Sequence, residues 1–114
     1  PQTREHAIID NGIAVGVLLG DARFSLDEVD FTKEIGSVTV GDETNAGPAT
    51  SIMGKDPLAG LVWAANELPK YGMHLKAGDF VVSGTVSVPL QVGAGDTASI
   101  SFTNLGTLNA EFVE

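Results

Sequence analysis

The sequence predicts an α+β fold in which one amphipathic helix is combined with a mixed, mainly antiparallel sheet. Residues 56–72 repeat apolar residues at helical spacing near the middle of the chain. Short apolar runs on both sides are separated by turns that contain glycine and aspartate, which is typical of hairpins. The chain has 114 residues without an internal repeat or a boundary, so we expect a single domain over residues 1–114.

The first strand is expected over residues 13–19, where β-branched residues are frequent. It follows Asp10-Asn11-Gly12, which favours a turn because Asn and Gly tolerate positive φ. Residues 21–34 are polar and charged, and we expect a surface loop or a helical turn that begins near Ser25. This part of the chain therefore leads from one strand to the next across the surface.

A hairpin is expected next, because residues 35–40 alternate apolar with small or polar positions. Gly41-Asp42 has the composition of a hairpin tip. Residues 43–50 are then either the return strand or a loop.

The helix has recognisable signals at both ends. Asp56 is the expected N-cap, Pro57 the first helical residue, and Gly72 lies just past the end. Pro69 should end or kink the helix in its last turn, because proline lacks an N–H group. Trp63 lies beside the apolar stripe and could cover a sheet edge or another subunit. The stripe that we expect to be buried consists of Leu58, Leu61, Val62, Ala65 and Leu68.

Four further strands are expected after the helix, at residues 79–86, 88–92, 97–102 and 106–113. Glycine-containing turns separate most of them. The third of these runs alternates hydroxyl-bearing residues with Ala98, Ile100 and Phe102, as a strand with one buried face does.

Composition excludes several classes of function. The formal net charge is −9 with only 6 Lys and Arg residues, which argues against binding to nucleic acid or to an anionic membrane surface. The absence of cysteine excludes disulfides and thiolate chemistry. No apolar run approaches the roughly 20 residues of a membrane span, and no secretory leader is visible. We therefore expect a soluble, cytoplasmic protein.

Few side chains suggest a metal site or a catalytic site. His6 and His74 have no neighbours at ligand spacing and are expected at the surface. Asp27, Glu28 and Asp30 could bind a cation in principle, but a solvated acidic loop is the more common meaning of such a run. No phosphate-binding loop, nucleophile elbow or zinc motif is present.

The corner Ser83-Gly84-Thr85 is the best local candidate for a site. Glycine lets a ligand approach the backbone, and the hydroxyl and N–H groups beside it could bind a carboxylate. The same three residues could equally form a plain bend between two strands.

Several short motifs, taken together, carry a family resemblance. They are a Gly-x-x-Pro-Leu helix start, an Ala-Asn-x-Leu segment, a Leu-x-x-Gly-Asp strand entry, and two later strand signatures, Gly-Asp and Leu-Gly-Ser. In this sequence they are Gly54 to Leu58, Ala65-Asn66-Glu67-Leu68, Leu75 to Asp79, Gly95-Asp96 and Leu105-Gly106-Thr107. In order and spacing the chain resembles the C-terminal part of the fumarylacetoacetate hydrolase superfamily. The branch it resembles contains the 2-oxopent-4-enoate hydratases and 4-oxalocrotonate decarboxylases of aromatic meta-cleavage pathways.

The resemblance implies a β-roll fold and a hydro-lyase activity. A hydratase of this type adds water to a 2-hydroxy-2,4-dienoate or 2-oxo-4-enoate, and this chain would form the side of the site that holds the substrate carboxylate. The implied substrate-binding residues are Thr85, with Ser83 and Gly84 beside it, and Asp10 and Asn11 near the metal side. A 2-oxo-3-enedioate decarboxylase of the same family is an alternative, as is a non-catalytic binding module.

The resemblance also implies a Mg²⁺ or Mn²⁺ cofactor. The family's metal ligands are a Glu-x-Glu pair and a later Glu, and they precede the part that this chain resembles, so no metal ligand is assigned here. Gly12-Ile13-Ala14 departs from the family's Ala-Ser-Ser, which puts the activity or the substrate in question. The expected partners are a small 2-oxo acid, other copies in an oligomer, and an N-terminal half as a separate chain.

Overall fold

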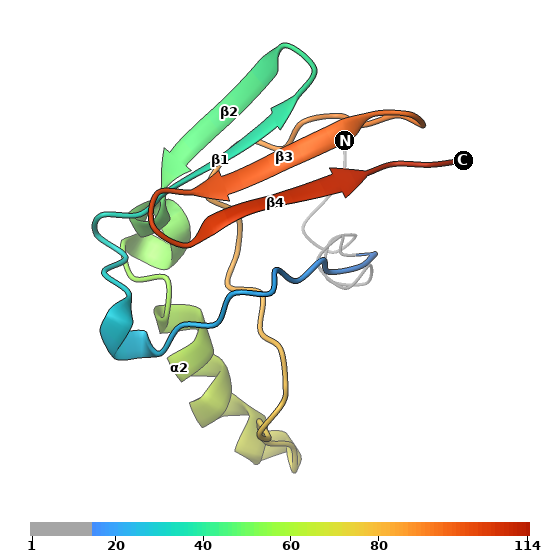
Figure 1. Ribbon diagram of the computed structural model, residues 1–114. Coiled ribbons are helices and arrows are strands. Elements are labelled where there is room, and N and C mark those ends of the chain that lie inside the picture. The colour runs from blue at the N-terminus through green and yellow to red at the C-terminus, as the bar shows by residue number, and fades with distance from the viewer. Residues whose placement is uncertain (1–14) are drawn as a thin grey trace.

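The computed structural model describes residues 15–114 of the chain (Figure 1). Asp10, Asn11, His6 and the Gly12-Ile13-Ala14 segment lie outside the described residues. The described elements comprise one α-helix, three short 3₁₀ helices and four strands. In chain order they are η2 (Leu26–Glu28), β1 (Ile35–Val40), β2 (Glu43–Pro48), η3 (Ala49–Gly54), α2 (Ala59–Glu67), η4 (Leu68–Tyr71), β3 (Thr97–Phe102) and β4 (Gly106–Glu111).

The four strands form one antiparallel sheet in the order β2-β1-β3-β4. The expected hairpin of β1 and β2 is confirmed, and its tip is Gly41-Asp42, where Gly41 has a φ of 56°. β3 and β4 form a second hairpin, as expected from the alternating pattern. The two hairpins join through the pairing of β1 with β3 (Figure 1). This pairing brings Gly36 opposite Phe102.

The two faces of the sheet differ in chemistry. On one face hydroxyl groups pair across strands: the Oγ atoms of Ser37 and Ser101 lie 2.8 Å apart, and the Oγ1 atoms of Thr39 and Thr44 lie 2.9 Å apart. The alternate positions put apolar side chains on the other face, as the period of two requires. Ala98 on this face is only 4% exposed. The apolar face is therefore where a pocket can form against the sheet.

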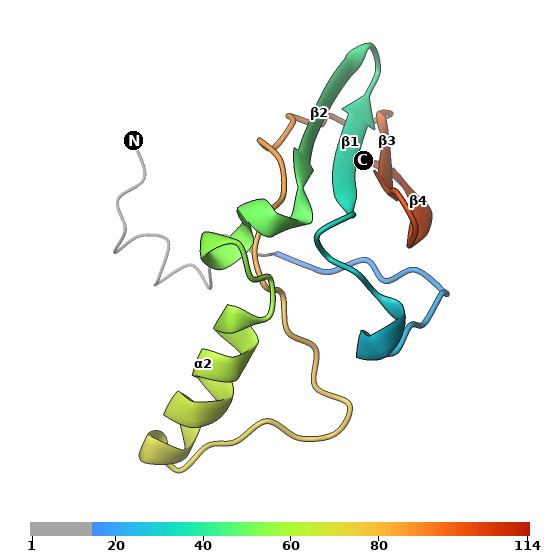
Figure 2. The same ribbon diagram turned by 90° about the vertical axis from the view of Figure 1, so that its left-hand side faces the viewer.

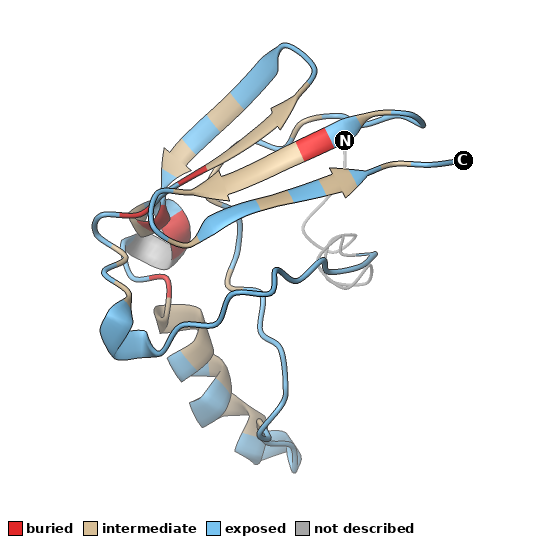
Figure 3. Ribbon diagram, viewed as in Figure 1, coloured by how far each residue is buried: buried red, intermediate tan, exposed pale blue. Residues whose placement is uncertain are grey.

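The helix is shorter and less buried than the sequence suggested. α2 begins at Ala59 instead of Pro57, and the Asp56 carboxylate accepts a 2.9 Å hydrogen bond from the Leu58 N–H in the turn before it. α2 extends away from the sheet (Figure 2), and Figure 3 shows no buried residue on it. The expected buried stripe is thus wrong: Leu58, Leu61 and Leu68 are half-buried, whereas Val62 and Ala65 are exposed.

The end of the helix follows the sequence signals. At Leu68 and Pro69 the α-helix changes into η4, because proline cannot donate the next helical hydrogen bond. Gly72 caps η4 with a φ of 72°. Trp63, beside the stripe, is 66% exposed. No helix in residues 15–114 is both long and apolar enough to cross a membrane.

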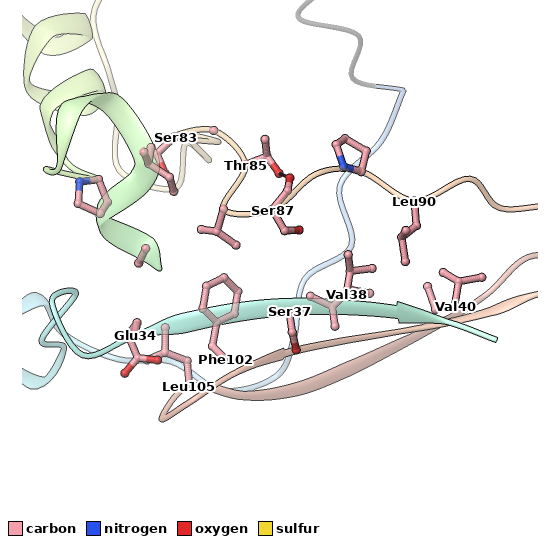
Figure 4. Close-up of a pocket in the computed structure, with 18 of the residues that line it drawn as sticks. Glu34, Ser37, Val38, Val40, Ser83, Thr85, Ser87, Leu90, Phe102 and Leu105 are labelled. Carbon is pink, nitrogen blue, oxygen red and sulfur yellow. Dashed lines mark hydrogen bonds between the residues drawn. The ribbon is translucent and has the colours of Figure 1, made fainter. Parts of the chain in front are cut away.

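Three expected strands are absent from the described part of the chain. Residues 15–19 of the first run are not in the sheet, and neither are residues 79–86 and 88–92. We call residues 79–92 the strap, because its part from Ser83 to Val92 crosses the apolar face of the sheet instead of extending one of its edges (Figure 4). Gly84 has a φ of 134° and Pro89 has no N–H to donate, and both interrupt the regular ladder that a strand needs.

Candidate functional site

A groove of about 550 Å³ lies between the strap and the apolar face of the sheet (Figure 4). The strap forms one wall, and β1 and β3 form the other. Figure 4 shows Ser83, Thr85, Ser87 and Leu90 on the strap side, opposite Val38 and Val40 of β1, whereas the Ser37 hydroxyl points to the other face of the sheet. The strap contributes Ser83, Gly84, Thr85, Val86, Ser87, Pro89, Leu90 and Val92, and the two strands contribute Ser37, Val38, Val40, Ala98, Ile100 and Phe102.

Two paired glycines set the depth at which the strap lies on the hairpin. Gly36 and Gly47 are opposite each other in the β1–β2 ladder, and both face Val86 of the strap. A methyl group at Gly47 would overlap the Val86 carbonyl oxygen, and one at Gly36 would overlap the Val86 side chain and the Phe102 ring. Only glycine leaves room for this approach of backbone to backbone.

Side-chain hydrogen bonds hold the strap against β2 and η3. The Asn45 amide donates to the Val88 carbonyl at 3.0 Å, and the Ser51 hydroxyl donates to the Val86 carbonyl at 3.5 Å. Strap carbonyls that a ladder would have used are thus satisfied by side chains instead. The groove keeps its shape because the strap is attached on the hairpin side.

The Ser83-Gly84-Thr85 corner, the best local candidate from the sequence, lines the groove. The Thr85 hydroxyl donates to the Ser87 carbonyl at 2.9 Å and so closes the turn. Within residues 15–114, none of the N–H groups of these three residues donates a hydrogen bond. N–H donors without a partner, beside a glycine that has no side chain, can bind an anionic oxygen. The other expected site residues, Asp10 and Asn11, lie outside the described residues.

Glu34 is a site residue that the sequence did not reveal. It lines the groove near the corner, is 2% exposed, and is the only buried charged residue in residues 15–114. Its carboxylate accepts hydrogen bonds from the Asn104 side-chain amide at 2.6 Å and from the Asn104 backbone N–H at 3.0 Å. The carboxylate is therefore held by the β3–β4 turn. No local signal marks Glu34, because its partner is 70 residues away and reaches it only through the pairing of β1 with β3.

The acidic loop is organised by local hydrogen bonds. The Glu28 carboxylate accepts bonds from the Ser25 N–H at 2.8 Å and from the Ser25 hydroxyl at 2.6 Å, which confirms the helical turn that begins near Ser25. Bonds from Lys33 and Thr32 lower the pKa of Asp30 to about 2. His74 is exposed, as expected. Residues 15–114 contain no group of three or more His, Cys, Asp or Glu side chains that could hold a metal ion.

Comparison with known proteins identifies the relatives of the chain. It is 31% identical over 108 residues to 2-oxo-hept-4-ene-1,7-dioate hydratase of Escherichia coli, a match that covers 93% of this chain and 40% of the relative. It is 29% identical over 106 residues to 2-keto-4-pentenoate hydratase 1 of Dechloromonas aromatica (strain RCB), covering 92% and 40%. No protein-family model matches the chain.

A solved structure has the same fold. It is 4-oxalocrotonate decarboxylase from Pseudomonas putida G7, complexed with magnesium and adipate. Its TM-score is 0.70 at 29% sequence identity, and the match covers 78% of this chain and 34% of the decarboxylase chain. A second structure of that enzyme is complexed with calcium and acetate.

These matches confirm the resemblance to the hydratase and decarboxylase group that the sequence motifs indicated. The chain is homologous to these enzymes over most of its length and spans about two fifths of the length of the curated relatives that it matches. The fold class is confirmed as well, with one main helix and a four-stranded antiparallel sheet.

Proposed function

We propose that this chain forms the carboxylate-binding wall of the active site in a hydratase that adds water to a 2-oxo-4-enoate or its 2-hydroxy-2,4-dienoate tautomer. The observation that carries the proposal is the corner in the groove. Ser83, Gly84 and Thr85 offer N–H groups that have no partner in residues 15–114, at the edge of a cavity large enough for a small acid. Relatives of the chain are named as hydratases of such acids.

Each part of the corner has a distinct task in this proposal. The N–H groups and the Ser83 hydroxyl donate to the substrate carboxylate, while the Thr85 hydroxyl keeps the turn closed through the Ser87 carbonyl. The apolar face of the sheet excludes water from the carbon chain, which strengthens these hydrogen bonds. Water then adds across the carbon–carbon double bond, giving a 4-hydroxy-2-oxo acid. Asp10 and Asn11 remain proposed site residues.

The proposal includes a divalent metal ion only because a homologous enzyme binds one. The described residues do not fit a metal site, since they contain no suitable group of ligands. The homologous decarboxylase is complexed with magnesium or calcium in its solved structures. We propose that any such ion, Mg²⁺ or Mn²⁺, is held by residues outside the described part of this site, and we assign it no step.

A decarboxylase acting on a 2-oxo-3-enedioate is the second candidate, because the solved structure that shares the fold is 4-oxalocrotonate decarboxylase. A binding module without catalysis is the third. An N-terminal half supplied as a separate chain, an oligomeric state and a cytoplasmic location stay predictions. The matched relatives are more than twice as long as this chain, which is consistent with a second half.

The test is an absorbance assay with 2-hydroxypenta-2,4-dienoate and Mg²⁺ on the purified protein with any chain that copurifies. We expect the dienol absorbance to fall faster than by spontaneous ketonisation, with formation of 4-hydroxy-2-oxopentanoate. Ser83→Ala should raise KM about tenfold with little change in kcat, because it removes a bond to an unreacting carboxylate. Ser99→Ala is the matched control, because Ser99 lies on the face of the sheet opposite the groove.

Two outcomes would contradict the proposal. If the absorbance falls only at the spontaneous rate and 2-oxohex-3-enedioate releases carbon dioxide, the decarboxylase is the correct function. If neither acid reacts and neither binds, the corner is a bend without a carboxylate site.

A further inference from the structure

The part of the strap that precedes the corner has the composition of a strand but pairs with no strand. Residues 80–82 are Phe-Val-Val, three consecutive residues of high β propensity. Their backbone N–H and C=O groups have no hydrogen-bond partner in residues 15–114. The side chains of Phe80, Val81 and Val82 are 73%, 44% and 66% exposed. Because successive side chains of an extended segment point to opposite faces, both faces of this segment are uncovered.

The helix that precedes this segment is uncovered as well. Residues 57–65 contain no polar side chain, and a helix that is apolar on all sides is normally buried. Among the described elements, α2 has extensive contacts only with η4, the turn that continues it. Val62 and Trp63 are 58% and 66% exposed. A helix of 9 residues is too short to be stable by itself in water, so α2 requires a surface on which to pack.

The helix and the unpaired segment belong to one projection of the molecule. We call residues 58–82 the arm, because they leave the sheet along α2 and return to it at the corner (Figures 1 and 2). The arm contains two Lys, one Glu and one Asp, so its formal charge is zero, whereas the whole chain carries −9. An apolar, uncharged surface on an otherwise acidic chain is typical of an interface with another polypeptide.

The solved structure that shares the fold indicates which polypeptide covers the arm. The match with 4-oxalocrotonate decarboxylase has a TM-score of 0.70 but covers only 34% of that chain, so most of that fold lies outside the match. A second copy of this chain is a poorer occupant, because it would bring a further charge of −9 to the interface.

We infer that residues 80–82 are a strand of a sheet that is completed by the part of the decarboxylase-like fold that this chain lacks, and that α2 packs on the same part. That part must offer an open strand edge next to apolar side chains, since backbone pairing and burial are both needed. Val82 directly precedes Ser83, so the added strand lies beside the corner and the carboxylate site is complete only in the assembly. This last consequence rests on the proposed function, whereas the pairing itself does not.

Hydrogen exchange tests the pairing in the protein isolated from the cells that make it, with every chain that copurifies. We expect the amides of residues 80–82 to exchange about 100-fold more slowly than in the recombinant 114-residue chain alone, because strand pairing protects N–H groups. Intact masses should show a polypeptide that contains the missing part of the fold, either separate or joined to this chain. The fluorescence of Trp63 should shift to shorter wavelength in the assembly, because α2 is then buried.

Proline substitutions separate backbone pairing from apolar contact. Val82→Pro keeps an apolar side chain but removes one N–H donor, so the protection of the neighbouring amides should fall about 100-fold. Val113→Pro is the matched control at a position that is 79% exposed and outside the arm, and it should leave this protection unchanged. Unchanged amide shifts of β3 and β4 show that each variant is folded. Val82→Asp, with Val113→Asp as its control, replaces this pair if Val82→Pro does not fold.

Three results would overturn the inference. The first is fast exchange of residues 80–82 in the isolated assembly. The second is slow exchange in an assembly that contains only copies of this chain, which would make a second copy the occupant. The third is an equal loss of protection in Val82→Pro and Val113→Pro. If residues 80–82 are protected as expected but the dienol assay shows no reaction, the proposed function fails and the pairing stands.

Discussion

Two segments of this chain have similar sequence patterns and different structures. Residues 97–111 and the strap both consist of apolar and hydroxyl-bearing runs between glycine-containing turns. The first segment forms β3 and β4, whose backbone groups pair with each other and with β1. The strap is also extended, but it crosses the apolar face and is held by side chains of Asn45 and Ser51. An alternating pattern therefore predicts an extended backbone, whereas pairing depends on which edges are within reach.

The functional consequence is a cavity. A strap that had joined the sheet as a further strand would leave its apolar face uncovered at this point. Because it crosses over Gly36 and Gly47 instead, it encloses the groove and directs the corner toward the sheet. The following variants test this difference between the paired segment and the strap.

The largest effect is expected from a charge in the paired segment. Ala98 lies between Val40 of β1 and Ala110 of β4, so Ala98→Asp would bury an unpaired carboxylate and lower the free energy of unfolding by about 3 kcal/mol or more. Val82→Asp places the same charge in the strap at a position that is 66% exposed, and should change stability by about 0.5 kcal/mol or less. Urea denaturation measures both. Equal losses would show that the strap is packed as firmly as the sheet.

A smaller loss of stability is expected when the hydrogen bonds between Asn104 and the buried Glu34 carboxylate are weakened. Asn104→Ala removes the side-chain donor from the buried carboxylate, keeps the backbone N–H donor, and should lower the free energy of unfolding by about 1.5 kcal/mol. Asn109→Ala on the exposed surface of β4 is the control and should cost little. Adding Glu34→Leu to Asn104→Ala should restore part of the loss, because the buried carboxylate that has lost one of its two donors is then gone. No recovery in the double variant would mean that Asn104 acts on the turn alone.

The docking of the strap is tested at Gly47. In Gly47→Ala the new methyl group would overlap the Val86 carbonyl, so the strap must move at a cost of about 1 kcal/mol. We expect amide chemical shifts to change along residues 84–90 while β3 and β4 stay unchanged. Gly93→Ala is the control, because its added methyl group would meet only the Asp96 carboxylate at an ordinary 3.6 Å. Unchanged strap shifts in Gly47→Ala would contradict the close approach.

The sequence predicted some elements of the fold well and others poorly. Turn chemistry located the Gly41-Asp42 tip, and proline and glycine marked the end of the helix, because these residues restrict their own backbone. The buried stripe of α2 was predicted wrongly, since periodicity identifies an apolar face without specifying what covers it. The two strands predicted in the strap are absent for a similar reason: the pattern indicates an extended backbone without specifying which strand it pairs with.

The site was predictable only where it is local. Ser83-Gly84-Thr85 is contiguous, so it could be named as a candidate before its position in the groove was known, and its role as a carboxylate site stays a prediction. Glu34 meets Asn104 only after β1 has paired with β3, and the fit of Gly36 and Gly47 to Val86 depends on the hairpin register. Such contacts between distant residues are properties of the assembled sheet.

The smallest effect on stability is expected in the turn before β1. This turn is held by hydrogen bonds between neighbouring residues and not by pairing with a strand. The Asp30 carboxylate accepts hydrogen bonds from Thr32 and pairs with Lys33 at 2.8 Å, and its pKa is lowered from 3.8 to about 2. Because the folded pKa lies below the unfolded value, the stabilising contribution is present above pH 3.8 and is lost as the pH falls through about 2. An NMR titration of the Asp30 carboxyl should therefore have its midpoint near 2 in the wild type.

Replacing the cation tests the cause of that shift. Lys33→Met should move the Asp30 midpoint upward toward 3.8, because the hydrogen bond and the charge of Lys33 are lost together. Lys70→Met is the matched control: it removes a cation from the similar i,i+3 pair with Glu67, and should leave Asp30 unchanged. A wild-type midpoint at 3.8 would mean that the exposed Asp30–Lys33 pair does not persist in solution. The turn would then enter β1 without a fixed geometry, and the position of Glu34 would depend on Asn104 and the sheet alone.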